Sequence, residues 1–84
     1  MQITFKLYAS LGEYLPADRR IGNQMILEVP QGATIDQVTA PYGLPPKLVH
    51  LVLVNGRYIA PADRSTHALQ ENDVLAIWPP VAGG

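Results

Sequence analysis

The last two residues of the chain combine features that suit one kind of chemistry. Gly83 and Gly84 have no side chains, so the reactive group they offer is the carboxylate of Gly84. A carboxylate is a poor electrophile until it carries a good leaving group, so reaction at its carbon requires activation by ATP. Because glycine adopts almost any backbone conformation, this end can also thread a narrow channel. We therefore expect Gly83 and Gly84 to be the chemically active end.

The residues before the two glycines favour an extended arm. Pro79 and Pro80 cannot donate to a strand ladder, and Val81 and Ala82 follow them. Six residues at about 3.1–3.3 Å each reach on the order of 20 Å, and the prolines stiffen the base of the arm. The sequence predicts a domain over residues 1–78 and an exposed, flexible tail over residues 79–84, with Pro79, Pro80 and Val81 available to a partner.

The rest of the chain lacks the usual catalytic and metal-binding groups. It has no cysteine, which excludes disulfides, thiolate metal sites and a cysteine nucleophile. His50 and His67 lack metal-ligand spacing, and Asp63, Glu71 and Asp73 are typical of turns and caps. No glycine-rich phosphate loop precedes a helix, so ATP should bind a partner. We expect a non-enzyme with no metal and no cofactor of its own.

Charge and hydropathy narrow the classes of partner. The six Lys and Arg residues are scattered and the net charge is −1, which excludes the basic stripe of a nucleic-acid or anionic-membrane binder. Arg57 and Arg64 are expected either to meet an acidic patch on a partner or to be solvated. No apolar run approaches the roughly 18 residues of a membrane span, and no secretory leader is recognisable. We expect a soluble cytoplasmic protein.

Two alternating runs near the N-terminus predict two half-buried strands. In residues 2–9 and 25–29 every second residue is apolar, and the first run extends to Ala9. Pro30 and Gly32 end the second run. Two such strands joined by a loop near the N-terminus favour a hairpin.

A helix is predicted to begin at Thr34. Thr34 and Gln37 have the spacing of a capping box, in which each side chain bonds the other residue's backbone N–H. Pro41 and Gly43 are poor residues for a helix interior, so the helix should be short and end near Tyr42.

The second half of the chain predicts three more strands. The apolar run of residues 48–54 indicates a central strand buried on both faces. Asn55-Gly56 is a strong two-residue turn, and residues 57–60 form a brief return strand. A polar loop anchored inward by Leu69 leads to a last strand over residues 73–78.

This order of elements predicts an α+β domain. One mixed sheet of about five strands would pack against one short helix, which is the β-grasp arrangement. Tyr8, Tyr58 and Trp78 fall on the outward faces of three strands. They could be ordinary sheet aromatics, but aromatic residues are also enriched at interface cores, so we predict that they form a docking patch.

These features together resemble the MoaD/ThiS family of ubiquitin-like sulfur carriers. The resemblance covers nearly the whole chain and rests on the element order and on three short motifs: Val54-Asn55-Gly56, Asn72-Asp73-Val74 and the tail Pro79-Pro80-Val81-Ala82-Gly83-Gly84. The family often has Asp-Gly-Asp in the last turn, where this chain has Glu71-Asn72-Asp73; asparagine also tolerates the left-handed conformation. The two prolines make the tail more similar to MoaD, the small subunit of molybdopterin synthase, than to ThiS.

The resemblance implies a cycle at Gly84. A ubiquitin-activating-type adenylyltransferase, similar to MoeB or ThiF, would adenylate the carboxylate. A sulfur donor would displace AMP and leave a thiocarboxylate. The large subunit of molybdopterin synthase, or another sulfur-accepting synthase, would then receive the sulfur during molybdenum cofactor biosynthesis. An aromatic or apolar partner contact is implied at Tyr8, Tyr58 and Trp78.

Three other hypotheses remain open at this point. A ThiS-type carrier would use the same chemistry for the thiazole of thiamine or for another sulfur-transfer pathway. A ubiquitin-like modifier would form an isopeptide bond between Gly84 and a lysine of another protein. A plain interaction module would bind its partner without Gly83 and Gly84.

Overall fold

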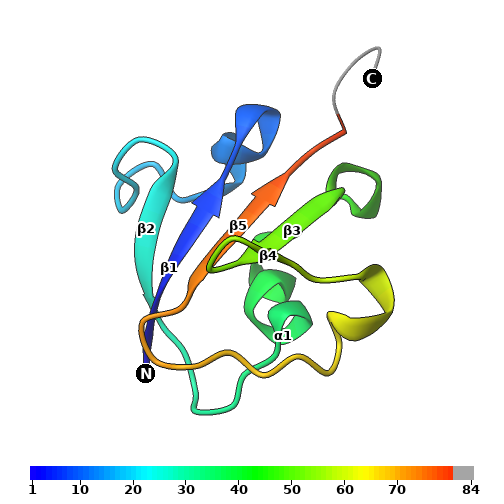
Figure 1. The fold of residues 1–84 in the computed structure, drawn as a ribbon. Helices are drawn as coiled ribbons and strands as arrows, with labels where there is room; N and C mark the ends of the chain where they lie inside the picture. The colour runs from blue at the N-terminus through cyan, green and yellow to red at the C-terminus, as the bar shows by residue number, and fades with distance from the viewer. Residues whose placement is uncertain (81–84) are drawn as a thin grey trace.

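The chain folds into one five-stranded sheet covered on one face by a short helix (Figure 1). A computed structural model describes residues 1–80. The strands are β1 (Gln2–Leu7), β2 (Gln24–Glu28), β3 (Leu51–Val54), β4 (Arg57–Tyr58) and β5 (Val74–Trp78), and the α-helix is α1 (Ile35–Thr39). This arrangement confirms the predicted α+β, β-grasp fold.

The last strand occupies the centre of the sheet. The order across the sheet is β2-β1-β5-β3-β4, with β5 parallel to β1 and antiparallel to β3. The two outer pairs, β1 with β2 and β3 with β4, are antiparallel. The run of residues 48–54, predicted as a central strand, does contain an interior strand, β3, which pairs with β5 and β4. The middle position belongs to β5, because strand order depends on pairing between segments far apart in sequence.

The helix begins as its sequence predicts. Gln37 donates its backbone N–H to the Thr34 hydroxyl at 3.3 Å, and Thr34 donates its own N–H to the Gln37 side chain at 2.9 Å. The α-helix ends at Thr39, and a 3-10 turn continues to Tyr42 before Gly43 adopts a left-handed φ of 62°. The other 3-10 turns are Ala9–Tyr14, Pro46–Leu48 and Pro61–Asp63. No helix within residues 1–80 is long and apolar enough to cross a membrane.

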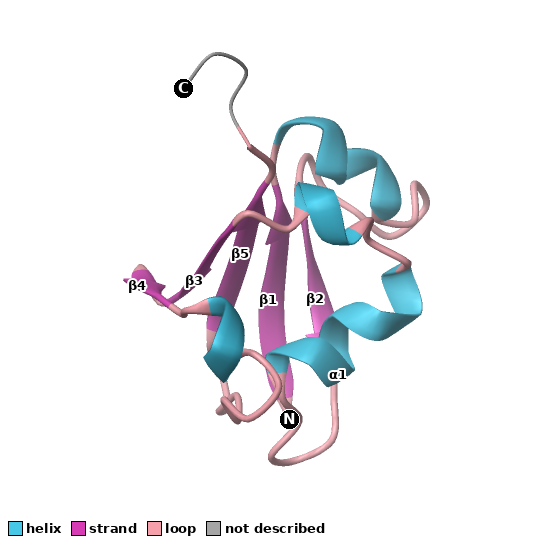
Figure 2. Cartoon of the chain, turned by 90° about the vertical axis from the view of Figure 1, so that its right-hand side faces the viewer, coloured by secondary structure: helices cyan, strands magenta, loops and turns pink. Residues whose placement is uncertain are grey.

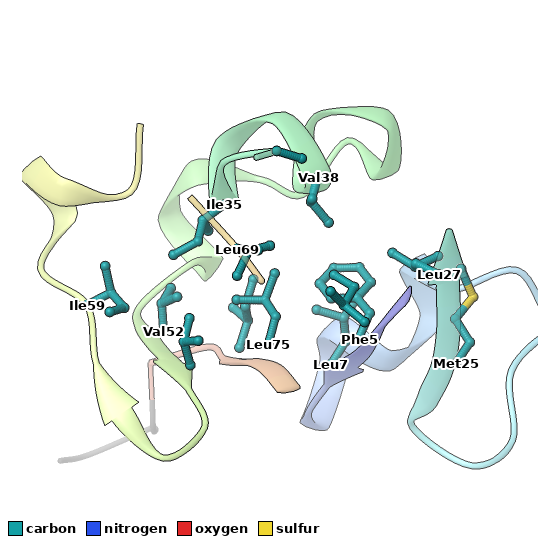
Figure 3. Packing of buried hydrophobic residues seen from close by; sticks show 14 of the residues in the cluster. Phe5, Leu7, Met25, Leu27, Ile35, Val38, Val52, Ile59, Leu69 and Leu75 are labelled. Carbon is teal, nitrogen blue, oxygen red and sulfur yellow. The ribbon is translucent and has the colours of Figure 1, made fainter. Parts of the chain in front are cut away.

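The core lies between α1 and the inner face of the sheet (Figure 3). Ile35 and Val38 of the helix point toward sheet residues that include Phe5 and Leu75. Leu69 is 2% exposed and anchors the long loop, as predicted. The other fully enclosed side chains come mainly from alternating strand positions: Ile3, Leu7, Leu11, Leu15, Val52 and Ile77.

Three strand boundaries differ from the sequence prediction by two residues or more. Leu48 lies in a 3-10 turn, because Pro45-Pro46 imposes a turn and β3 begins only at Leu51. The residues of β3 are buried on the inner face and half-buried on the other, so this strand is one-sided. Ala9 lies outside β1 with a φ of 52°, and Ala60 lies outside β4.

Asn55 ties the turn after β3 to the start of β5. Asn55 and Gly56 have positive φ of 52° and 81°, which confirms the predicted turn. The Asn55 side chain donates to a carboxylate oxygen of Asp73 and accepts from the backbone N–H of Val74, both at 2.8 Å. These bonds help to set where β5 enters the sheet.

We expect Asn55→Ala to lower the free energy of unfolding by about 2 kcal/mol. It removes two hydrogen bonds of about 1 kcal/mol each and places a Cβ-bearing residue at positive φ without the local bonds that suit asparagine there. For a domain of this size the melting temperature should fall by roughly 10 °C, as measured by circular dichroism. The melting temperature of Asn55→Gly should fall by less, because glycine tolerates the same φ. A melting temperature unchanged in Asn55→Ala would contradict the role.

Candidate docking face and tail base

Within residues 1–80, no helix or strand covers the face of the sheet opposite α1 (Figure 2). Residues paired directly across strands point to the same face. Ala76 pairs with Leu53, and Leu53 pairs with Tyr58, so these side chains all lie on the open face. Ile26 of β2 also lies on this face and is 54% exposed. The open face therefore presents apolar side chains from β2, β5, β3 and β4. Strand β1 contributes the polar residues Thr4 and Lys6 to this face.

Tyr8 and Trp78 form an aromatic pair at one end of this face. Their rings are parallel to within 6°, with centroids 4.0 Å apart. Tyr8 follows β1 directly and Trp78 ends β5, so the parallel pairing of these strands brings the rings together. Both side chains are half-buried. Of the three aromatics predicted to share a patch, these two are in contact.

Tyr58 lies on the same face but apart from that pair. It is 52% exposed and pairs with Leu53, whereas Trp78 pairs with Leu51. Half-buried Leu51 and Leu53 of β3 therefore lie between Trp78 and Tyr58. We name the set formed by Tyr8, Leu51, Leu53, Tyr58 and Trp78 the open-face patch.

The base of the tail is held on both sides. The carbonyl of Ile77 accepts from the N–H of Tyr8 at 3.0 Å, and the carbonyl of Trp78 accepts from the N–H of His50 at 3.1 Å. The ladder cannot continue in the same way, because Pro79 and Pro80 have no N–H. The chain thus leaves the middle of the sheet directly after Trp78 (Figure 1).

The side chain of Pro79 packs within the folded domain. It is buried, whereas Pro80 is exposed, so the prediction that the arm is exposed from residue 79 was wrong at Pro79. A prolyl ring next to a central strand is apolar and has no donor to satisfy, which makes its burial inexpensive. Val81, Gly83 and Gly84, the other predicted tail residues, lie outside the described residues.

Arg64 is not available to an acidic patch on a partner. It is 7% exposed, and its guanidinium donates to the carbonyls of Ile59, Val49 and His50. Both readings of this residue from the sequence, partner contact and solvation, were therefore wrong. Arg57 on β4 is exposed.

Asp63, Glu71 and Asp73, the acidic residues expected to serve turns and caps, take part in backbone hydrogen bonds of this kind. The Asp73 carboxylate accepts from the N–H of Gln70 at 2.8 Å, and the Glu71 carboxylate accepts from the N–H of Gln2. Asp63 accepts through its carbonyl from Thr66 and His67 in a turn. Within residues 1–80, no group of three or more His, Asp or Glu side chains is placed to hold a metal ion.

A hollow of about 590 Å³ lies elsewhere, between the end of β2 and α1. Its apolar lining includes Val29, Val38, Pro41 and Tyr42, and it includes neither the open-face patch nor the tail base. We assign no role in the terminal chemistry to this hollow.

Two components of the site were not predicted from the sequence. Leu51 and Leu53 belong to the open-face patch, and their period-two spacing within the run of residues 48–54 was the signal that could have revealed it. The contacts of Arg64 and His50 at the tail base had no local signal, because Arg64 is 14 residues away from His50.

The fold has close structural neighbours among solved proteins. The crystal structure of SAMP1 from Haloferax volcanii superposes with a TM-score of 0.69 at 25% identity and covers 100% of both chains. The HVO 2177 protein of Haloferax volcanii superposes with a TM-score of 0.74 at 26% identity and covers 100% of this chain and 87% of that one. A Pyrococcus furiosus protein assigned as molybdopterin converting factor, subunit 1, has a TM-score of 0.67 at 19% identity, over 95% and 98% of the two chains, and supports the fold alone.

The family assignment comes from a match between this sequence and a protein-family model. No curated protein matches this chain significantly. The model of the ThiS family matches residues 11–84, which span the open-face patch from β3 onward, the tail base and the two terminal glycines. Together with the ubiquitin-like fold, this match shows that the chain belongs to the ThiS family of small ubiquitin-like carrier proteins.

Proposed function

We propose that this chain carries sulfur on the C-terminal carboxylate of Gly84, as the small subunit of a molybdopterin synthase. The observation that carries the proposal is the exit of the chain from the centre of the sheet at Trp78, followed in sequence by Pro79-Pro80-Val81-Ala82-Gly83-Gly84. Membership of the ThiS family supports the same chemistry. The two prolines favour the MoaD branch within it.

The chemistry proceeds in three steps. A MoeB/ThiF-like adenylyltransferase transfers AMP from ATP to the Gly84 carboxylate and releases pyrophosphate. The terminal sulfur of a persulfide donor then forms a carbon–sulfur bond and displaces AMP, which gives an acyl disulfide. A thiol of the donor system attacks the other sulfur of this bond, forms a disulfide with it and so releases the thiocarboxylate. A synthase partner finally takes the sulfur from that group. In this proposal the chain is a co-substrate located in the cytoplasm, and its partners supply the acid, base and nucleotide-binding groups.

The open-face patch has a separate task in this scheme. Large aromatic and aliphatic side chains that are partly exposed provide binding energy when a partner desolvates them. Trp78 belongs to this patch and is also the last residue of β5 before the tail. A partner that docks on the patch therefore holds the tail base at a defined position relative to its own active site.

A modifier function is the second candidate. Its specific support is the full-length structural likeness to SAMP1, since another structure of that kind is described as a small archaeal modifier protein 1. A modifier would use the same adenylate, but a lysine amine would attack in place of sulfur. A ThiS-type carrier for another sulfur acceptor keeps the sulfur chemistry and changes only the last partner.

We expect Gly84 to be required for activation. After incubation with a MoeB/ThiF-type enzyme, ATP and a sulfur source, the intact mass of the wild-type chain should increase by the replacement of one oxygen by sulfur. Deletion of Gly84, and extension of the chain by one residue beyond it, should both abolish this increase while the melting temperature stays the same. An unchanged wild-type mass with a competent activating enzyme would refute sulfur carriage.

The same reaction mixture distinguishes the modifier. Covalent adducts in which the Gly84 carbonyl is joined to lysine residues of other proteins would favour modification over sulfur transfer. Gel mobility and peptide mass spectrometry would detect them. A thiocarboxylate that passes to a molybdopterin synthase large subunit, with no such adducts, would favour the primary proposal.

We expect substitutions in the open-face patch to weaken docking. Tyr58→Ala should raise the KM of the activating enzyme for this protein by about tenfold, the effect of losing an interface residue worth 1–2 kcal/mol, with little change in kcat. Ile21→Ala is the matched control, because Ile21 is 83% exposed but lies in the loop before β2. Equal KM values for both variants would show that the patch does not dock this partner.

A further inference from the structure

Arg64 is an unusual residue to find inside this domain. It is the one buried charged side chain among residues 1–80, and 7% of its surface is exposed. No carboxylate of the described residues forms an ion pair with it. A buried guanidinium without a counter-ion is costly unless dipoles replace its lost water. Its position therefore calls for a reason beyond packing.

Three backbone carbonyls surround the guanidinium. Nε donates to Ile59 at 3.1 Å, Nη2 to His50 at 3.2 Å and Nη1 to Val49 at 3.5 Å. Val49 and His50 lie between a 3-10 turn and β3, so their carbonyls have no regular ladder partner. Partly buried carbonyls need donors, and the fork of an arginine supplies several at once.

His50 extends this contact to the tail base. The β3–β5 register pairs Leu51 with Trp78, yet the N–H of His50 also donates to the Trp78 carbonyl, one residue out of register. Such an extra residue opposite one partner is the geometry of a β-bulge, which bends a strand end. The path from Arg64 through His50 thus ends at the last carbonyl before Pro79.

The backbone of Arg64 is itself anchored. Its carbonyl accepts from the N–H of Asp36 in the first turn of α1 at 3.2 Å, and its N–H donates to Pro61 at 3.4 Å. The backbone of Arg64 is therefore attached to the helix layer, while the hydrogen-bond partners of its guanidinium lie directly before β3 and directly after β4. This arrangement connects the tail base to the rigid part of the domain.

We propose that Arg64 is a positioning residue for the terminal arm. By holding the Val49 and His50 carbonyls, it keeps the His50 N–H on the carbonyl of Trp78, and so fixes the direction in which the chain leaves the sheet. The inference rests on the proposed function, because its effect is on delivery of the Gly84 carboxylate. Docking through the open-face patch should depend on Arg64 much less than delivery does, since its guanidinium bonds backbone carbonyls and none of the patch side chains.

The kinetic test separates delivery from docking. Arg64→Met should lower the kcat of adenylation by about 10- to 100-fold, the usual effect of a small misplacement of a reacting group, while KM changes less than about twofold. Arg19→Met, an exposed arginine replaced in the same way, should match the wild type. A rise in KM alone, or no change in either constant, would overturn the proposal.

A measurement without the enzyme tests the path directly. In amide hydrogen exchange followed by NMR, the His50 N–H should exchange at least tenfold faster in Arg64→Met, whereas the Tyr8 N–H on the other side of the tail base should keep its rate. Unchanged exchange at His50 would overturn the proposal even if kcat fell. If the wild type is never adenylated, the proposed function fails, and exchange alone then decides whether Arg64 holds the tail base.

Arg64→Lys keeps the inference testable if Arg64→Met does not fold. Lysine retains the charge, but its single ammonium group cannot bond three carbonyls in the arginine geometry. We expect faster His50 exchange and a smaller loss of kcat than in Arg64→Met. A lysine variant identical to the wild type in both measurements would show that charge alone suffices and that the three-carbonyl contact does not position the arm.

Discussion

The placement of β5 between β1 and β3 is the constraint on which the rest of the structure depends. A central strand is bonded on both edges, so its last residues have little freedom. The Ile77 and Trp78 carbonyls are held by Tyr8 and His50, and the prolines that follow cannot extend the ladder. The arm therefore starts from the most restrained part of the sheet.

The side chains of β5 also point alternately to the two faces of the sheet. Leu75 and Ile77 are fully buried and pack under α1, whereas Trp78 lies on the open face against Tyr8. Alternation along one strand thus joins the core to the docking surface without a loop between them. Trp78, which belongs to the proposed docking surface, is joined by a single peptide bond to Pro79, where the terminal arm begins.

The sequence predicted the features that depend on local interactions and missed those that depend on distant ones. The Thr34 capping box and the Asn55-Gly56 turn were correct because each is determined by a few adjacent residues. The central position of β5 and the burial of Arg64 and Pro79 were missed because they depend on which segments meet in three dimensions. Tyr8 and Trp78 were predicted to share a patch, but their direct contact results from the parallel pairing of β1 with β5, which the composition does not reveal.

The proposed carrier and modifier functions place the same demand on this chain. Both begin with an adenylate at Gly84, and both need a docking face and a defined origin for the arm. They diverge only when a nucleophile attacks, either sulfur or a lysine amine, and in this scheme the nucleophile comes from a partner. The fold that this chain shares with SAMP1 does not distinguish the two functions. Selection between the outcomes must then act through the side chains that a partner contacts, and the proposed docking surface on this domain is the open-face patch.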